Sequence, residues 1–275
     1  MLALWGASGC GAHVPEHARS ESCAECHPSA VTDWSASRHA VAFDNPVFQR
    51  SWSDTRAPWC LTCHLPEEGV GCAACHGPEA RDCADCHDFD LPRELGGAAS
   101  GTRGQSTAEE WSRSGAAAQG LGCADCHPPH HPRGGTDVER VREVVGAAVR
   151  VSGDDVRADV SVTGVGHAFP TGDPFRRLRL TVCADLACLR PIATTDLERR
   201  LERTADGGWA LASDTRVQAP IEGLDATRSF SMHAPGARSW QLTLHLTDPR
   251  HADELGSAAA YVVANGLVDT SSETP

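Results

Sequence analysis

The chain lacks three features that would place it in common functional classes. No run of about 20 apolar residues occurs in its 275 residues, so the sequence predicts no membrane-spanning helix. There is no excess of basic residues, because 24 basic against 37 acidic residues give a formal net charge of -13. Nucleic-acid binding needs a basic face, so this composition excludes nucleic acid as a partner. Lysine is absent altogether, and tyrosine occurs once.

The two halves of the chain differ in composition. Of the 13 cysteines, all but two precede residue 136, in a half that is poor in branched apolar residues and rich in Gly, Pro, Ala and His. Such a half cannot build an ordinary core, so something other than side chains must fill it. The shift predicts two domains, at 21–135 and 136–275, preceded by a leader segment at 1–20.

The leader segment resembles the end of a signal peptide without its charged start. Ala7-Ser8-Gly9-Cys10 resembles a lipobox, in which the cysteine is acylated, so Cys10 is a candidate lipid anchor. The alternative is a free cysteine in an unstructured terminus. We predict a signal-peptide remnant, a lipobox and a linker over residues 1–20.

Five copies of the motif C-x-x-C-H occur in the first half. They are Cys23, Cys26 and His27; Cys60, Cys63 and His64; Cys72, Cys75 and His76; Cys83, Cys86 and His87; and Cys123, Cys126 and His127. Two thiols at this spacing add to the vinyl groups of a haem, and the adjacent histidine binds its iron. Zinc knuckles and structural disulfides are the alternatives, but neither requires a histidine after every motif. The motifs therefore predict five covalent c-type haems.

Two consequences follow from covalent haem. Bacteria attach it outside the cytoplasm, so the sequence predicts a periplasmic, outer-membrane or cell-surface protein. The motifs that begin at Cys60, Cys72 and Cys83 are separated by linkers that cannot exceed ~40 Å even when extended. Their haems must lie close together, which suits electron transfer.

The histidines outside the motifs are candidates for the sixth ligand of each iron. His39 is the strongest, because the run that begins at Pro28 has no helix breaker before Asn45-Pro46. On such a helix His39 lies ~18 Å beyond His27, so it should bind another haem and tie the first segment to the cluster. The alternative is an exposed helix histidine.

The other candidates are weaker. One of His130 and His131 should serve a neighbouring haem, His13 and His17 could fold back over one, and His167 lies in a Gly/Pro-rich loop that could reach one. Methionine ligands are nearly excluded by the positions of Met1 and Met232. The remaining histidines, which are expected to be structural or exposed, are His233, His245 and His251.

Two tracts resemble known multihaem cytochromes. The run CAECHPSAVTDWSASRHAVAF is similar to the first haem segment of cytochromes related to the tetrahaem carriers of nitrifying bacteria. The tract from CADCHPPHHPRGG to GHAFPTGDPFRRLRL is similar to bacterial cytochromes whose haem domain precedes a β-rich domain with a GHxFPTG loop. The resemblance implies distal-ligand roles for His39, for His130 or His131, and for His167.

The second half alternates apolar and polar residues, as half-buried strands do. The apolar positions are Val156, Ala158, Val160 and Val162; Leu178, Leu180 and Val182; and Trp240, Leu242, Leu244 and Leu246. About seven antiparallel strands in a sandwich fit this pattern. The fold class is therefore α+β, in which a largely helical and irregular haem-packed domain precedes an antiparallel β-sandwich.

Cys183 and Cys188 flank a short turn in the predicted sandwich. In an oxidising compartment these residues predict a local disulfide, and two buried thiols are the alternative. The sandwich carries no catalytic constellation, so we interpret it as a docking or scaffold domain.

The function that fits best is electron transfer between redox partner proteins, such as other cytochromes or a membrane complex. The alternative is a multihaem reductase or oxidase of a small nitrogen or sulfur compound at one open haem. Relatives that reduce nitrite often use C-x-x-C-K, and hydroxylamine-oxidising relatives cross-link a tyrosine to the haem. The absence of lysine, with Tyr261 the sole tyrosine, favours a carrier over an enzyme. A third hypothesis, compatible with the first, is a subunit that docks through its β domain.

Overall fold

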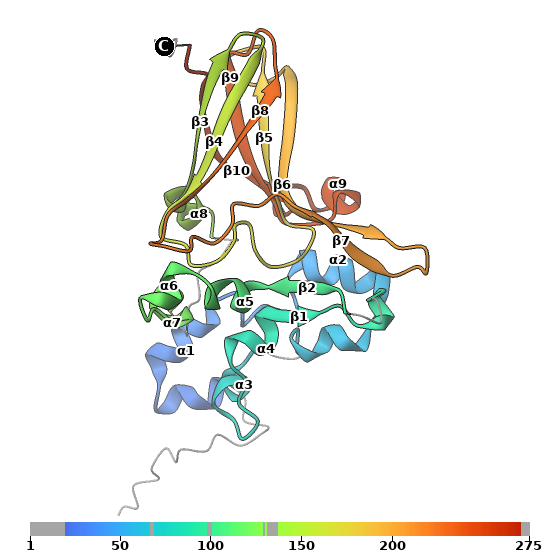
Figure 1. Ribbon diagram of the computed structural model, residues 1–275. Coiled ribbons are helices and arrows are strands. Elements are labelled where there is room, and N and C mark those ends of the chain that lie inside the picture. The colour runs from blue at the N-terminus through green and yellow to red at the C-terminus, as the bar shows by residue number, and fades with distance from the viewer. Residues whose placement is uncertain (1–19, 67–68, 98–100, 129, 131–136, 271–275) are drawn as a thin grey trace, which may run out of the picture.

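The computed structural model describes residues 20–66, 69–97, 101–128, 130 and 137–270. Short helices dominate up to Val144, and long antiparallel strands dominate from Val145 onward (Figure 1). This mixed α+β arrangement confirms the predicted fold class. Within the ranges described, no helix combines the length and apolar character needed to cross a bilayer.

The first part consists of short elements joined by turns. Its elements are η1 (Ser20–Glu25), α1 (Pro28–Ser35), α2 (Pro46–Thr55), η2 (Pro58–Thr62), α3 (Cys72–His76), α4 (Cys83–His87), β1 (Asp88–Asp90), η3 (Arg93–Leu95), β2 (Arg103–Ser106), α5 (Thr107–Ser112), α6 (Gly115–Ala118) and α7 (Cys123–Cys126). Proline at the first position starts α1 and α2, and the Asn45 side chain caps α2 by accepting a hydrogen bond from the Val47 N–H at 2.9 Å.

The helix predicted from Pro28 to the Asn45-Pro46 pair is shorter than expected. It ends at Ser35, and His39 lies in the turns that follow. Tertiary hydrogen bonds replace helical ones here, because Val70 N–H donates to the His39 carbonyl at 2.8 Å and Trp34 Nε1 donates to the Val70 carbonyl at 2.8 Å. The segment around His39 is thus hydrogen-bonded to Val70, just before the third motif.

Apolar packing is scarce in the first part. Among its described residues, the buried apolar side chains are Ala57 and Ala116 alone. The ten motif cysteines are half-buried or exposed. Two buried alanines cannot stabilise a domain of this size. Another group is therefore needed to complete its interior.

The second part is built from α8 (Val138–Val144), eight strands and a short helical excursion. The strands are β3 (Val145–Ser152), β4 (Asp155–Val162), β5 (Arg177–Cys183), β6 (Pro191–Arg203), β7 (Trp209–Asp214), β8 (Ala226–His233), β9 (Ser239–His245) and β10 (Ala260–Leu267), and the excursion is η4 (Pro249–His251), α9 (Ala252–Leu255) and η5 (Gly256–Ala258). One sheet has the order β10-β9-β5-β6-β7 and the other β3-β4-β8. All their pairings are antiparallel.

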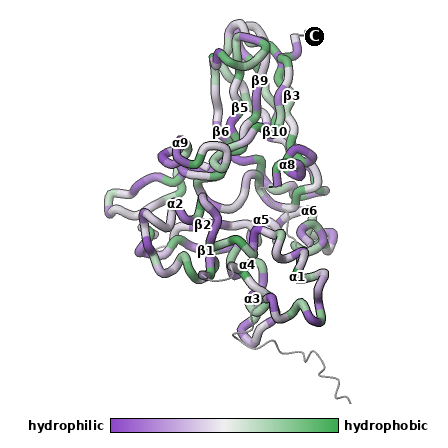
Figure 2. The backbone as a smooth tube through the Cα atoms, turned by 180° about the vertical axis from the view of Figure 1, so that it is seen from behind, coloured by the Kyte–Doolittle hydropathy of each residue, from purple (hydrophilic) through white to green (hydrophobic). Residues whose placement is uncertain are grey.

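The core lies between these two sheets. The alternating positions predicted on β4, β5 and β9 are all buried, and Leu178, Leu180 and Leu242 are fully inaccessible. Figure 2 shows the sandwich from behind, with apolar and polar segments alternating along its strands. The predicted disulfide between Cys183 and Cys188 is present at the end of β5.

The two parts of the chain are in contact along β6 and β7. Arg199 on β6 is buried and donates to the carbonyls of Gly104 at 3.3 Å and Arg103 at 3.0 Å. Trp209 N–H at the start of β7 donates to the Gly96 carbonyl at 2.8 Å. Arg50 on α2 pairs with Glu254 on α9 at 2.6 Å. The β part therefore rests directly on the part that carries the motifs.

Candidate haem-binding sites

Each C-x-x-C-H motif forms one helical turn. Helices α3 and α4 span their motifs, and in the other three motifs the histidine N–H donates to the carbonyl of the first cysteine at 2.8 to 3.0 Å. Residues i, i+3 and i+4 of a helix share a face, so this turn places both thiols and the imidazole on one side. That is the arrangement that attachment to a single porphyrin requires.

The aspartate inside the fourth and fifth motifs has a structural role. Asp85 accepts a hydrogen bond from the Asp82 N–H at 2.9 Å, while the Asp82 side chain caps the start of α4. Asp125 accepts from the Gly122 N–H at 2.7 Å in the same way. These capping interactions start the helical turn at the first cysteine.

Three imidazole pairs have the same separation. The ring centres of His39 and His87 lie 6.3 Å apart, as do those of His76 with His130 and of His127 with His167. The interplanar angles are 36°, 36° and 12°. Each pair joins one motif histidine to one histidine from outside the motifs.

This separation fits a metal held between two imidazoles. Imidazoles bound to opposite faces of one metal, each through a bond of about 2.0 Å, have ring centres about 6 Å apart. Ordinary aromatic packing spans centroid distances of about 4.5 to 7 Å, so a single pair would not distinguish metal binding from packing. Three equal separations, each with a C-x-x-C-H histidine as one member, fit haem iron with two axial histidines.

The imidazoles of the His39–His87 pair are held in the neutral form. Burial lowers the pKa of His87 to about 4, mainly through loss of hydration. The same effect lowers the pKa of His39. A neutral ring keeps a lone pair for a metal. The Gln105 side-chain amide nitrogen lies 3.3 Å from Nδ1 of His87.

His130 faces His76, which distinguishes it from its neighbour. The sequence left His130 and His131 as equal candidates, and His131 lies outside the described residues. His130 is three residues from His127 but pairs with the histidine of the third motif. The ring of His130 thus lies nearest to a motif histidine from another segment of the chain.

His167 comes from the β part and faces a histidine of the helical part. Its loop joins β4 to β5, and its Nδ1 donates to the Ala168 carbonyl at 3.0 Å, which leaves Nε2 unprotonated. Desolvation lowers the pKa of His167. The fifth site therefore takes one imidazole from each part of the chain.

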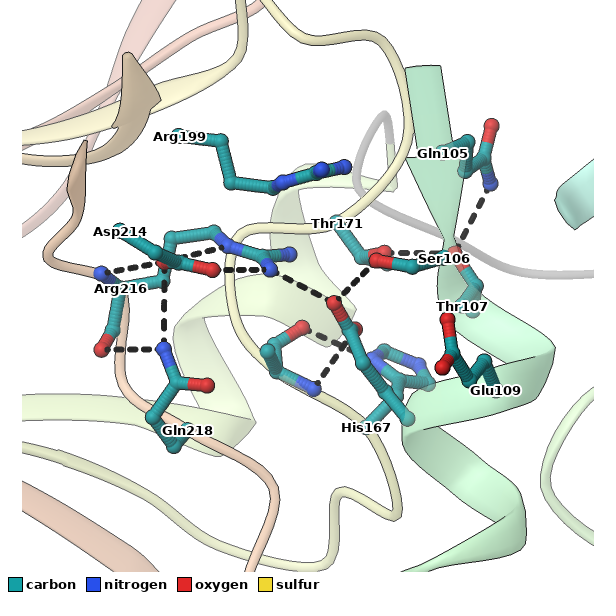
Figure 3. Close-up of polar contacts among 12 residues, drawn as sticks. Gln105, Ser106, Thr107, Glu109, His167, Thr171, Arg199, Asp214, Arg216 and Gln218 are labelled. Carbon is teal, nitrogen blue, oxygen red and sulfur yellow. Dashed lines mark hydrogen bonds and ion pairs between the residues drawn. The ribbon is translucent and has the colours of Figure 1, made fainter. Parts of the chain in front are cut away.

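A buried ionic cluster holds the His167 loop in place (Figure 3). Glu110 on α5 accepts from the Ala168 N–H at 3.2 Å and from Arg216 Nη2 at 2.6 Å. Arg216 is buried and also pairs with Asp214 at 2.7 Å. A buried charge is costly unless it is paired, so this cluster fixes the loop against α5. The cluster was not anticipated from the sequence, because Glu110 lies 106 positions from Arg216 along the chain.

The histidines of the first two motifs differ from the other three. His64 donates from Nδ1 to the Ala42 carbonyl at 2.7 Å, and the Phe48 ring stacks on it at 3.8 Å. Among the described residues, no second imidazole is paired with His27 or His64 in a ring contact. The candidates His13 and His17 lie outside the described residues, as does the proposed lipidation site Cys10.

The other three histidines of the β part behave differently. His233 is exposed and pairs with Asp155 at 3.0 Å, as expected. His251 is buried and lies 3.1 Å from Asp54, which is a structural contact. His245 was expected on an exposed face, but it is partly buried, with Nδ1 3.2 Å from Arg177. The pKa of His245 is lowered to about 4, mainly by desolvation and to a smaller extent by the positive charge of Arg177.

The zinc alternative does not match the geometry. All ten motif cysteines and their histidines lie in the described part of the chain. In that part, no group of three or more Cys, His, Asp or Glu residues is arranged to hold a metal ion. A zinc knuckle needs four such ligands around one point.

Comparison with known proteins identifies the fold. No family model and no curated protein matches the chain. Among solved structures, a penta-haem cytochrome c552 from Thermochromatium tepidum matches with a TM-score of 0.62 and 20% sequence identity. The match covers 92% of this chain and 99% of the cytochrome. The chain has a penta-haem cytochrome fold. The fold implied by the sequence resemblance, in which a β-rich part follows a haem-carrying part, is confirmed.

Proposed function

We propose that the chain binds five c-type haems covalently and carries electrons between redox partners. The observation that carries this proposal is the set of three imidazole pairs with a common separation of 6.3 Å. The five attachment motifs, the near absence of apolar packing around them and the likeness to a penta-haem cytochrome support it. Bound haem supplies one-electron redox chemistry, and a second axial histidine closes the iron to substrates.

The residues divide into three roles under this proposal. The ten motif cysteines attach the porphyrins, and the five motif histidines are the proximal ligands. His39 is the distal partner of His87, His130 of His76, and His167 of His127. His13, His17 and His131 remain candidates for the sites of His27 and His64.

Covalent haem also places the protein. We propose a periplasmic, outer-membrane or cell-surface location, with Cys10 as a candidate lipid anchor. The partners would be other cytochromes or a membrane complex. In the domain division we propose, 21–135 carries the haems and 136–275 forms a scaffold that completes the fifth site.

The test is a haem count combined with low-temperature EPR on the purified, matured protein. Pyridine haemochrome analysis and intact mass should give five haems per chain, and the EPR spectrum should contain only low-spin ferric signals. Fewer than five haems, or bound zinc, contradicts the proposal. A high-spin haem that binds nitrite, hydroxylamine or cyanide contradicts the carrier and supports a reductase or oxidase of a small nitrogen or sulfur compound.

A further inference from the structure

We propose that the fourth attachment segment, Cys83–His87, is a three-way junction at which the second, third and fifth sites meet, so that the relay is branched. This inference rests on the proposed function, because it concerns how the five haem sites are connected. A relay that follows motif order would instead join the fourth site to the third and fifth only.

Arg81 brings three of the attachment segments together. It lies two residues before Cys83, and its N–H donates to the carbonyl of Ala74, inside the third motif, at 2.8 Å. Its guanidinium donates to the carbonyl of Thr62, inside the second motif. The guanidinium also hydrogen-bonds the thiol of Cys86. One residue thus ties the second and third motifs to the fourth, the third through its backbone and the second through its side chain.

The motif sulfurs give a second line of evidence. The thiols of Cys63 and Cys86 are within hydrogen-bonding reach of each other, and so are those of Cys83 and Cys123. In a c-type haem each of these sulfurs is bonded to the edge of a porphyrin. Neighbouring sulfurs would therefore place porphyrin edges side by side between the fourth site and the second and fifth, while the third is joined to the fourth through Arg81.

The imidazole side of the fourth site agrees with this. A chain of side chains runs from His87 to Gln105 at 3.3 Å, from Gln105 to Thr107 at 2.9 Å, and from Thr107 to Thr171 at 2.6 Å. Thr171 lies in the loop that carries His167. The fourth and fifth sites are thus in contact through both thiols and ligands.

The first site joins the network through the third. Cys72 N–H donates to the Ser20 hydroxyl at 2.8 Å, and Val70 N–H donates to the His39 carbonyl at 2.8 Å. These contacts fasten the first segment to the start of the third motif. The resulting connections give one arm through the third and first sites, one through the second, and one through the fifth.

NMR of the fully reduced wild-type protein tests the junction without any substitution. Nuclear Overhauser contacts are expected between substituents of the fourth porphyrin and those of the second, third and fifth. Absence of contacts to any one of the three overturns the proposal.

A ligand exchange tests the same connections by their electrostatics. H39M replaces the distal ligand of the fourth site by one that raises its reduction potential. The fourth iron then stays reduced while its neighbours titrate, and its lower charge makes each neighbour harder to reduce. Three other potentials should fall. The matched control H167M makes the same change at the fifth site, where only two potentials should fall, that of the fourth site and that of the third, whose ligand His130 lies in the fifth segment.

The outcomes separate this inference from the proposed function. A haem count below five in the wild-type protein contradicts the proposed function. Five haems with fewer than three shifted neighbours in H39M, or as many shifted in H167M as in H39M, overturn the junction alone.

Discussion

Backbone carbonyls orient the imidazoles that would bind iron. Nδ1 of His64 donates to Ala42 and Nδ1 of His167 to Ala168, so Nε2 is the free nitrogen in both. The motif histidines were predictable from the sequence because C-x-x-C-H carries its own chemistry. The carbonyl partners were not, because any residue can supply a carbonyl.

His39→Ala should convert one haem in five to a high-spin form. The substitution removes the imidazole that faces His87 and leaves that iron with an open position. Low-temperature EPR should show a new high-spin ferric signal that changes on addition of cyanide. His233→Ala is the control, because His233 is exposed on β8. An unchanged low-spin spectrum in H39A contradicts the assignment.

His245 should make the stability of the β part depend on pH. Its pKa of about 4 in the folded chain lies below the ordinary histidine value, so between about pH 4 and 6.5 the unfolded chain binds the extra proton. The free energy of unfolding should therefore rise with pH across this window.

Urea unfolding at pH 4.5 and 6.5 measures this dependence. His245→Gln should reduce the difference between the two pH values, whereas His233→Gln should leave it unchanged. An equal pH dependence in wild type and H245Q would show that the partial burial of His245 beside Arg177 carries no such linkage.

At the scale of elements, strands with a regular alternation of apolar residues were predictable from the sequence. The replacement of helical hydrogen bonds by tertiary ones was not. The apolar positions predicted on β4, β5 and β9 are the buried ones, because successive side chains of a strand point to opposite faces of the sheet. The helix from Pro28 was predicted too long, because the segment around His39 instead bonds to Val70. A single sequence contains no signal for a contact between residues 31 positions apart, and the same limit applies to which histidines pair.

Glu110→Gln should disturb the fifth site more than the fold. Glu110 bonds both Arg216 and the backbone beside His167, and its side chain is 14% exposed. Glutamine replaces one acceptor oxygen by a donor and removes the charge, at a cost of about 1 to 3 kcal/mol in unfolding free energy. The EPR signal of one haem should shift in g value.

Glu109→Gln is the matched control, because Glu109 is the neighbouring residue but pairs with Arg103 and Arg113 near the surface. Equal spectra in E110Q and wild type would indicate that the cluster does not position His167. Spectral changes of equal size in both variants would contradict a specific role for Glu110.

At the scale of the whole molecule, the two parts fold for different reasons. The β part has a continuous apolar core between two sheets, whereas the described residues before Val138 bury two alanines. The composition of the first half anticipated this difference. The contacts between the attachment segments were not predictable. They depend on the path of the loops, and composition does not determine that path.

Chain produced without haem attachment should therefore be only partly folded. Residues 20–128 should lose amide protection from hydrogen exchange, while β4, β5 and β9 should keep it, since their side chains already exclude water. Hydrogen exchange with mass spectrometry of matured and unmatured protein makes the comparison. Equal protection of the first part in both forms would contradict a core completed by haem.

The His127–His167 pair has a consequence for how such chains can evolve. One imidazole is encoded before the β part and the other within it, so, under the proposed ligation, recombination that exchanged either half would replace one of the two ligands of the fifth haem. Insertions in the loop between β4 and β5 would be restrained for the same reason. The two halves are expected to be inherited together, and homologues should vary most at the far end of the sandwich.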